Sequence, residues 1–147
     1  MKYDGIIFDM DGTIWNTEKE VCLAWNKVLA DAGHPKRVTG DELAGYMGLP
    51  MTEIAKRMFG TDNYDSVAEL FGRCMQYENE YIAKYGALLY PDLINTLKQM
   101  YTKIPLFIVS NCQSGYIEAF FKAYDTAGYF NCLLYTSDAA DELDGVD

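Results

Sequence analysis

"YDGIIFDMDGTIWNTE", residues 3–18, joins a short apolar run to two aspartates that stand one residue apart, Asp9 and Asp11. The run predicts a buried β-strand, because it is short, apolar and rich in isoleucine and phenylalanine. At positions i and i+2 of an extended chain, the two carboxylates project to the same side. Gly12 permits a sharp turn whose N–H groups can hold an anion. The stretch is therefore either an acidic turn after a strand or one half of a catalytic site.

A block of helical patterns follows this stretch. Two T-x-x-E capping boxes, Thr17 with Glu20 and Thr39 with Glu42, predict the first two helix starts. Pro50 and Gly60 bracket a third helix. A long fourth helix has an apolar and aromatic stripe that extends to Tyr85 and ends at Gly86. The four helices are expected within residues 17–33, 39–48, 49–60 and 65–86.

Strand and helix patterns alternate in the next part of the chain. "YPDLINTLKQM" predicts a helix, "IPLFIV" a second apolar strand and "SGYIEAFFKAYDTAG" another helix. Such alternation is typical of a parallel sheet. The expected fold class is therefore α/β, with a parallel-sheet core at residues 1–16 and 87–131 and an inserted α-helical cap at residues 17–86.

Composition limits the possible partners. The formal net charge is −10, which argues against a nucleic-acid partner because such a partner needs a basic face. No apolar segment approaches the ~18–20 residues that would span a membrane. The N-terminus enters a strand directly and has no signal-peptide pattern. The four cysteines form no C-x-x-C pair, which indicates free thiols. We therefore expect a cytoplasmic protein with neither a nucleic-acid nor a membrane partner.

The aspartate pair has a specific chemistry at a strand end. Open parallel α/β sheets bind ligands at the carboxyl ends of their strands, where Asp9 and Asp11 are expected. Two close carboxylates tolerate ionisation best beside a hard cation such as Mg²⁺, so the pair is a candidate metal site. One carboxylate can attack phosphorus, and the other can protonate the leaving oxygen and later activate water.

"FDMDGT" resembles the first motif, D-x-D-G-T, of the haloacid dehalogenase (HAD) superfamily, most of whose members are Mg²⁺-dependent phosphohydrolases. The resemblance extends from residue 1 to about residue 131 and implies an incomplete Rossmann-like HAD core. It implies that Asp9 is the nucleophile and Asp11 the acid/base, with both residues at the Mg²⁺ site. Family dehalogenases lack the second aspartate, so Asp11 favours a phosphatase.

"LFIVSNCQSG" resembles the second motif of the same superfamily. The resemblance implies that Ser110 and the N–H of Asn111 bind the substrate's phosphoryl group, and Gly12 and Thr13 are expected to help. A hydroxyl and free N–H groups at a strand end before a helix also form an anion site on physical grounds. The alternative is that Ser110 or Ser114 only caps the next helix.

The helical block resembles the small C1 cap of phosphoglycolate phosphatase-like and β-phosphoglucomutase-like members. In the family this cap closes over the site and selects the substrate. Gly48 and Leu49 are expected at the tip of the substrate-facing loop, with a plain helix connection as the alternative. Trp25 and the tyrosines of the fourth helix are expected in the cap core. His34 receives no catalytic role.

Two further family motifs are not found. The third needs a lysine, and Lys122, the only lysine after Ser110, lies inside a predicted helix. The final stretch, "CLLYTSDAADELDGVD" at residues 132–147, offers acids for the fourth motif, but no core-type strand is expected before them. It resembles a translated transposon-end sequencing adapter, so we expect a non-native tail on a C-terminally truncated chain.

The predicted function is a Mg²⁺-dependent phosphomonoester hydrolase of small phosphorylated metabolites, similar to phosphoglycolate phosphatase and acting through an aspartyl-phosphate. The incomplete motif set predicts that the 147-residue chain is weak or inactive. One alternative is a β-phosphoglucomutase-like phosphosugar mutase, which uses the same aspartate pair. Another is a non-catalytic fragment. A receiver domain is disfavoured because receivers have no helical block of this length after the first strand.

Overall fold

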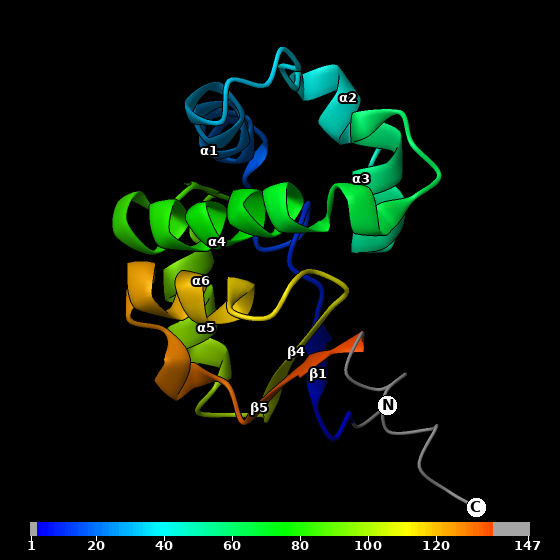
Figure 1. The fold of residues 1–147 in the computed structure, drawn as a ribbon. Coiled ribbons are helices and arrows are strands. Elements are labelled where there is room, and N and C mark those ends of the chain that lie inside the picture. The colour runs from blue at the N-terminus through cyan, green and yellow to red at the C-terminus, as the bar shows by residue number, and fades with distance from the viewer. Residues whose placement is uncertain (1–2, 137–147) are drawn as a thin grey trace, which may run out of the picture.

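The computed structural model describes residues 3–136 of the chain (Figure 1). These residues form a mixed α/β structure, which confirms the predicted fold class. The strands are β1 (Ile6–Phe8), β2 (Trp15–Asn16), β3 (Leu88–Leu89), β4 (Leu106–Ser110) and β5 (Cys132–Tyr135). The helices are α1 (Glu18–Asp31), α2 (Gly40–Ala44), α3 (Met51–Phe59), α4 (Ala68–Tyr85), α5 (Leu93–Met100) and α6 (Tyr116–Tyr124), with 3₁₀ turns at Tyr64–Ser66 and Ala127–Tyr129.

The main sheet has the strand order β1-β4-β5, and both strand pairs are parallel. Phe8 of β1 aligns with Ile108 of β4, so the carboxyl ends of the two strands reach the same edge of the sheet. The apolar residues of β4 alternate between buried and half-buried positions, as expected for a central strand covered by helices. This topology brings the residues after β1 next to the end of β4, although about 100 residues separate them in sequence.

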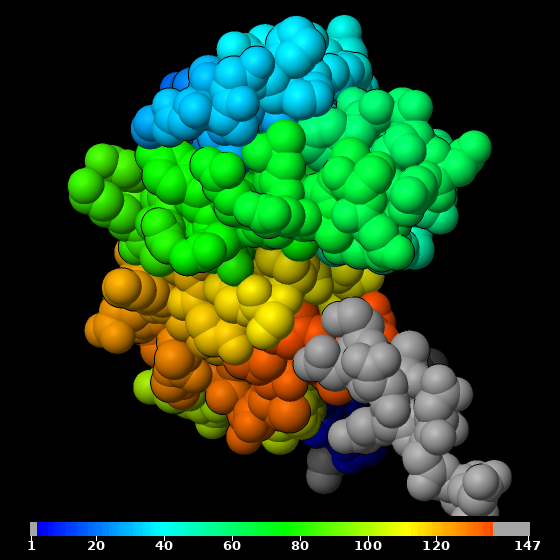
Figure 2. All heavy atoms as spheres, in the orientation of Figure 1, coloured from blue at the N-terminus to red at the C-terminus, as the bar shows by residue number. Residues whose placement is uncertain are grey.

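Two separate hydrophobic clusters stabilise the molecule. One lies around the sheet and includes Ile108, Ile117 and Phe120. The other lies among α1–α4 and includes Trp25 and Phe71, whose rings meet edge to face. Figure 1 shows these helices on one side of the molecule and the sheet with α5 and α6 on the other, and Figure 2 shows the cap lying across the core. The division into core and cap at residues 17–86 stays a prediction, which these two clusters support.

Two strands of two residues each connect the two parts. β2 lies where the chain leaves the core, and β3 lies where it returns, and the two pair in antiparallel fashion. The Tyr124 hydroxyl binds both the N–H and the carbonyl of Ala87 beside this pair. Helix α4 packs against α1 in the cap and against α6 in the core. The cap therefore rests on the core through α4 and is joined to it by a paired linker.

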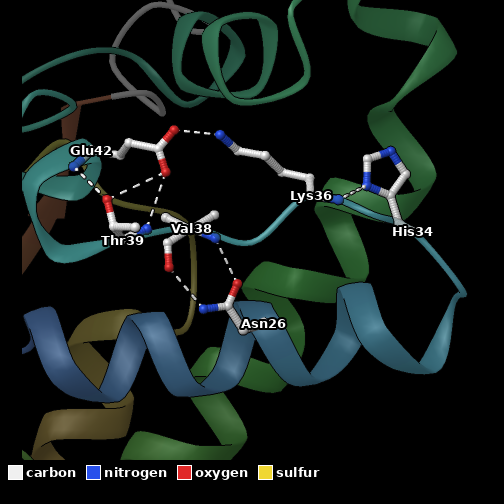
Figure 3. Close-up of polar contacts among 6 residues, drawn as sticks. All are labelled: Asn26, His34, Lys36, Val38, Thr39 and Glu42. Carbon is white, nitrogen blue, oxygen red and sulfur yellow. Dashed lines mark hydrogen bonds and ion pairs between the residues drawn. The ribbon is translucent and has the colours of Figure 1, made fainter.

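Only one of the two predicted capping boxes forms. Thr39 and Glu42 make both reciprocal hydrogen bonds at the start of α2, and Lys36 pairs with the Glu42 carboxylate (Figure 3). The Asn26 side chain fixes the same segment by bonding both the N–H and the carbonyl of Val38. Thr17 stands at the N-cap of α1 but makes no capping bond with its side chain. The box predicted at Thr17 is therefore wrong, because its hydroxyl binds elsewhere.

Two further expectations need correction. The stripe predicted on α4 runs to Tyr85, but Tyr85 is 62% exposed, and Glu78 and Ile82 are buried instead. No core-type strand was expected after Asn131, yet Cys132–Tyr135 forms β5, which pairs with β4. The expectation failed because four apolar residues suffice to extend a sheet edge through backbone hydrogen bonds. The adapter origin of residues 132–147 stays a prediction, and the acids from Asp138 onward lie outside the described residues.

Candidate active site

The two predicted carboxylates stand just beyond β1, at the edge where β4 ends. Asp9 is exposed, whereas Asp11 is partly buried. Gly12 adopts a φ of 76°, a left-handed conformation that favours glycine, and the chain turns there. Both aspartates and Gly12 line a common cavity. The structure thus brings the aspartate pair to the place expected from the sequence.

Two backbone N–H groups of this turn are already used. The Gly12 N–H donates to the carbonyl of Trp15 at 3.0 Å, and the Thr13 N–H donates to that of Met10 at 3.2 Å. Thr13 is exposed and is not among the residues that line the cavity. The phosphate-binding role predicted for Thr13 therefore has no support in this geometry. Gly12 can contribute space and chain direction, but its N–H is not free for an anion.

Ser110 and Asn111 follow the predicted arrangement more closely. Ser110 ends β4 and is buried, and Asn111, an exposed residue, comes directly after it. Both residues line the same cavity as Asp9. The Ser110 hydroxyl accepts a hydrogen bond from the Cys112 N–H at 3.4 Å, which leaves its own proton available to donate. Neither Ser110 nor Ser114 caps α6, because the N-cap of that helix is Gly115.

Asp11 belongs to a hydrogen-bonded cluster that the sequence did not reveal. The Tyr116 hydroxyl donates to Asp11 Oδ1 at 2.5 Å, and the Thr17 hydroxyl donates to the same oxygen at 3.3 Å. The two hydroxyls also lie 2.9 Å apart. Tyr116 is the first residue of α6 and Thr17 precedes α1, so the cluster joins the core to the entrance of the cap. This contact explains why Thr17 does not cap its own helix.

Burial raises the pKa of Asp11 above its ordinary value. The hydrogen bonds from Tyr116 and Thr17 stabilise the carboxylate and offset part of that rise, while the charge of Asp9 adds to it. Burial also raises the pKa of Tyr116 well above its ordinary value, so its hydroxyl stays protonated and acts as a donor. The two aspartates therefore have different environments, since Asp9 is exposed and Asp11 is partly buried and hydrogen-bonded.

The cavity lies between the sheet edge and the helical cap and has a volume of about 490 Å³. Its core side carries the aspartate pair with Ser110 and Asn111. Its cap side carries the loop between α2 and α3, including Gly48 and Leu49, the two residues predicted at the substrate-facing tip. Gly48 has a φ of 79°, so the loop turns there in a conformation that favours glycine. Because Gly48 and Leu49 line the cavity, their position favours a substrate-facing loop over a plain connection between two helices.

The cap also brings a carboxylic acid to the cavity that sequence analysis did not identify. Glu78 lies in the middle of α4 and is only 4% exposed, yet it lines the cavity. The indole N–H of Trp25 donates to Glu78 Oε2 at 2.5 Å. Trp25 thus lies in the cap core, as expected, and also contacts a cavity residue. A signal was available in the sequence, since Glu78 interrupts the apolar face of α4.

A divalent cation has a limited but suitable set of ligands. Within residues 3–136, no group of three or more His, Cys, Asp or Glu side chains is placed to hold a metal ion. Magnesium sites that also bind phosphate often use only one or two protein carboxylates, with substrate oxygens and water completing the shell. The exposed Asp9 carboxylate is therefore the candidate side-chain ligand for Mg²⁺, and the family resemblance implies that Asp11 contributes its backbone carbonyl, which leaves the Asp11 carboxyl free to carry a proton. All four cysteines are free thiols.

No described helix is long and apolar enough to cross a membrane. Comparison with curated proteins finds no match. Three solved structures illustrate the likeness to known folds. The first, from Lactobacillus plantarum, carries a provisional phosphoglycolate phosphatase name. Its TM-score is 0.73 and its sequence identity is 17%, and the match covers 94% of this chain and 64% of the Lactobacillus plantarum protein.

The second is CbbY from Rhodobacter sphaeroides in complex with xylulose-(1,5)bisphosphate, with a TM-score of 0.76 and 18% identity, over 96% of this chain and 72% of that one. The third is YfnB from Bacillus subtilis bound to magnesium, with a TM-score of 0.65 and 19% identity, over 95% of this chain and 68% of that one. The chain thus spans 64% to 72% of the length of these proteins. At such identities the likeness is one of fold.

The sequence itself gives the more specific match. The family model of haloacid dehalogenase-like hydrolases matches residues 6–142, which include the aspartate pair, the cap and the strand that ends at Ser110. This match agrees with the fold, with the position of the carboxylates and with the insertion of the helices between β1 and β4. The chain belongs to the haloacid dehalogenase-like hydrolase family.

Proposed function

We propose that the protein is a Mg²⁺-dependent phosphatase that hydrolyses phosphomonoesters of small metabolites. The observation that carries the proposal is the meeting of Asp9, Asp11 and Ser110 in one cavity beneath a helical cap. A cavity of about 490 Å³ suits a small phosphorylated molecule rather than a polymer. The family match supports hydrolysis, and the second aspartate supports phosphate esters as the substrates.

Asp9 is assigned as the nucleophile because its carboxylate is exposed in the cavity. Its oxygen attacks phosphorus, the bond from phosphorus to the ester oxygen breaks, and an aspartyl-phosphate forms. Asp11 protonates the leaving ester oxygen and then accepts a proton from the water that hydrolyses the intermediate. The raised pKa of Asp11 suits the first step, and its hydrogen bond to Tyr116 fixes the orientation of the carboxyl group.

The phosphoryl oxygens require donors and positive charge. The Ser110 hydroxyl and the backbone N–H of Asn111 are assigned as donors. When bound, Mg²⁺ would neutralise part of the charge shared by the phosphate and the carboxylates, and Asp9 and Asp11 would hold it. The magnesium-bound YfnB and the sugar bisphosphate complex of CbbY have similar folds, which supports a site of this kind.

Turnover by this chain is expected to be slow. None of the described residues that line the cavity is a lysine, arginine or histidine. The charge of the phosphate is therefore balanced by hydrogen-bond donors and a metal ion alone. Electrostatic stabilisation of the transition state is usually the largest contribution to phosphoryl transfer, so the lack of a cationic side chain should lower the rate.

The test is formation of a phosphate-mimicking adduct, which does not require turnover. The 147-residue protein is mixed with Mg²⁺ and beryllofluoride, and bound fluoride is followed by ¹⁹F NMR. We expect a signal from bound fluoride for the unmodified protein and for Asp11→Asn, because the acid/base is not needed for adduct formation. We expect none for Asp9→Asn. An equal signal from Asp9→Asn, or no signal from any of the three proteins, would contradict the proposed function and favour a non-catalytic fragment.

A further inference from the structure

The cap side of the cavity contains an ionisable group to which no role has been assigned. Glu78 lies on α4 and lines the same cavity as the aspartate pair. The helices α1 to α3 also contribute apolar side chains to the cavity wall, among them Val21, Leu43 and Ile54. A carboxylic acid in such surroundings is costly to bury, and proteins retain one only with suitable partners or for a functional reason.

The hydrogen-bond partners of Glu78 within the protein are neutral, and the charge of Asp11 also disfavours its ionised form. The Trp25 indole N–H donates to it at 2.5 Å. The Gln113 amide also stabilises its charged form, and that amide donates to the Asn79 side chain at 3.0 Å. Burial nevertheless raises the pKa of Glu78 to about 7. A glutamine at this position would satisfy the Trp25 indole equally well and would avoid the cost of burying a charge, so a purely structural role does not require an acid.

The charged side chains of the cavity wall, among the described residues, are all acidic. Four of its described residues are acids, namely Asp9, Asp11, Glu18 and Glu78, and none is a lysine, arginine or histidine. Mg²⁺ and the phosphoryl group would offset charge at the core side only. At the cap side, Glu78 faces whatever organic group the phosphate carries. A ligand carboxylate there would meet a like charge without a cation, whereas a proton donor would meet an acceptor.

We propose that Glu78 is a specificity-determining residue that accepts a hydrogen bond from a hydroxyl or ammonium group of the substrate and excludes substrates that carry a carboxylate. This inference rests on the proposed function and deepens it, since it names the chemical class of the group attached to the phosphate. It also departs from phosphoglycolate, the carboxylate-bearing phosphate ester that the sequence resemblance suggested.

The experiment measures binding of phosphonates, whose phosphorus–carbon bond cannot be hydrolysed, so the result does not depend on turnover. A matched series has three carbon atoms and differs only at its end: 3-aminopropylphosphonate, 3-hydroxypropylphosphonate and 3-phosphonopropionate. The corresponding five-carbon series allows for a greater reach between the two sides of the cavity. Dissociation constants are measured by calorimetry with Mg²⁺ at pH 8, where Glu78 is mostly ionised.

In the series that reaches Glu78, we expect the amine or the alcohol to bind at least ~10-fold more tightly than the carboxylate, because a charge contact of this kind is worth a factor of ten or more. Glu78→Gln should reduce that ratio to less than ~3-fold. Glu80→Gln removes the same charge from an exposed position of the same helix and should leave the ratio unchanged. A tighter amine identifies an ammonium group, and equal binding of amine and alcohol identifies a hydroxyl.

Equal binding of all three end groups would overturn the inference, as would a ratio that Glu78→Gln does not change. Failure of every phosphonate to bind would also overturn it. Circular dichroism and thermal unfolding of both variants exclude loss of the fold as the cause. Failure of the proposed function gives a different pattern, since beryllofluoride would then form no adduct at Asp9 while the phosphonates could still be discriminated by Glu78.

Discussion

The two sides of the cavity are built in different ways. On the core side, the functional groups follow the ends of two adjacent parallel strands, so the backbone itself places Asp9 and Ser110. On the cap side, Trp25 and Glu78 come from the middle of two helices, and packing between α1 and α4 places them. The difference suggests that chemistry depends on the core and substrate choice on the cap. It also explains why the first group was identified from sequence and the cavity position of Glu78 was not.

The strongest test of the core side is Asp9→Asn. This variant removes the nucleophile, and we expect hydrolysis of p-nitrophenyl phosphate with Mg²⁺ to fall at least ~10³-fold from whatever rate the unmodified chain shows. Asp4→Asn, a matched change at an exposed aspartate before β1, should leave the rate unchanged. Turnover that survives Asp9→Asn would break the assignment of chemistry to the core side.

The second prediction concerns the cap side and the pH dependence of stability. The pKa of Glu78 is raised from 4.5 to about 7 in the folded state, so the folded protein binds this proton more tightly than the unfolded chain does. Its contribution is complete below pH 4.5 and is lost as the pH rises through about 7. The free energy of unfolding should therefore fall by about 3 kcal/mol across that range.

Urea unfolding at pH 4.5, 6 and 8 measures this effect. In Glu78→Gln the pH-dependent fall in the free energy of unfolding should be smaller by about 3 kcal/mol. Glu80→Gln should show the same pH dependence as the unmodified protein. Asp11 contributes in the same direction because burial also raises its pKa, so any fall that remains in Glu78→Gln should diminish further when Asp11→Asn is added. Identical pH profiles for the unmodified protein and Glu78→Gln would show that Glu78 is not buried as an acid.

The third prediction concerns Tyr116, the residue that orients Asp11. Tyr116→Phe removes the 2.5 Å hydrogen bond to Asp11 and should lower kcat by about 10-fold, since a bond to a charged group contributes ~1.5–3 kcal/mol. KM should change little, because Tyr116 holds the acid/base rather than the phosphate. Tyr124→Phe removes a hydroxyl from the same helix that binds Ala87, and it should not affect kcat in this way. A rise in KM at constant kcat would instead assign Tyr116 to substrate binding.

The fourth prediction has the smallest expected effect and concerns Thr17 and Thr39. Each threonine precedes a helix and is followed three residues later by a glutamate, but the two are expected to have different roles. Thr39→Ala breaks a capping box and should lower the free energy of unfolding by about 1 kcal/mol. Thr17→Ala removes no cap, and its effect should appear in kcat because its hydroxyl contacts Asp11. Chemical denaturation and the phosphatase assay on both variants separate the two roles. A pure stability loss in Thr17→Ala would contradict the assignment.

Much of the fold followed from local patterns. The alternation of apolar strands and amphipathic helices predicted a parallel sheet with a helical insertion, and Pro50 and Gly60 marked the ends of α3. These features depend on residues close in sequence, whose preferences act through backbone geometry. The aspartate pair and Ser110 could be found for the same reason, since each simply follows an apolar strand.

The remaining features depend on contacts between distant residues. The Thr17 hydroxyl had a local partner in the capping box, but Asp11 and Tyr116 replaced it. Glu78 interrupts the apolar stripe of α4, and Glu78 and Ile82 are buried whereas Tyr85 is exposed. This pattern of burial follows from how α4 packs against both α1 and α6. A single helical stripe cannot reveal that a helix has two neighbours on different sides.

The paired linker at β2 and β3 has a mechanical consequence. Two chain crossings that were independent would act as separate tethers, and the cap could twist as well as tilt. Because Trp15 pairs with Leu89 and Asn16 with Leu88, the two crossings are tied together by backbone hydrogen bonds and act as one ribbon. The cap should therefore swing about a single axis, so that Glu78 and the Gly48 loop approach and leave the aspartates along one fixed path.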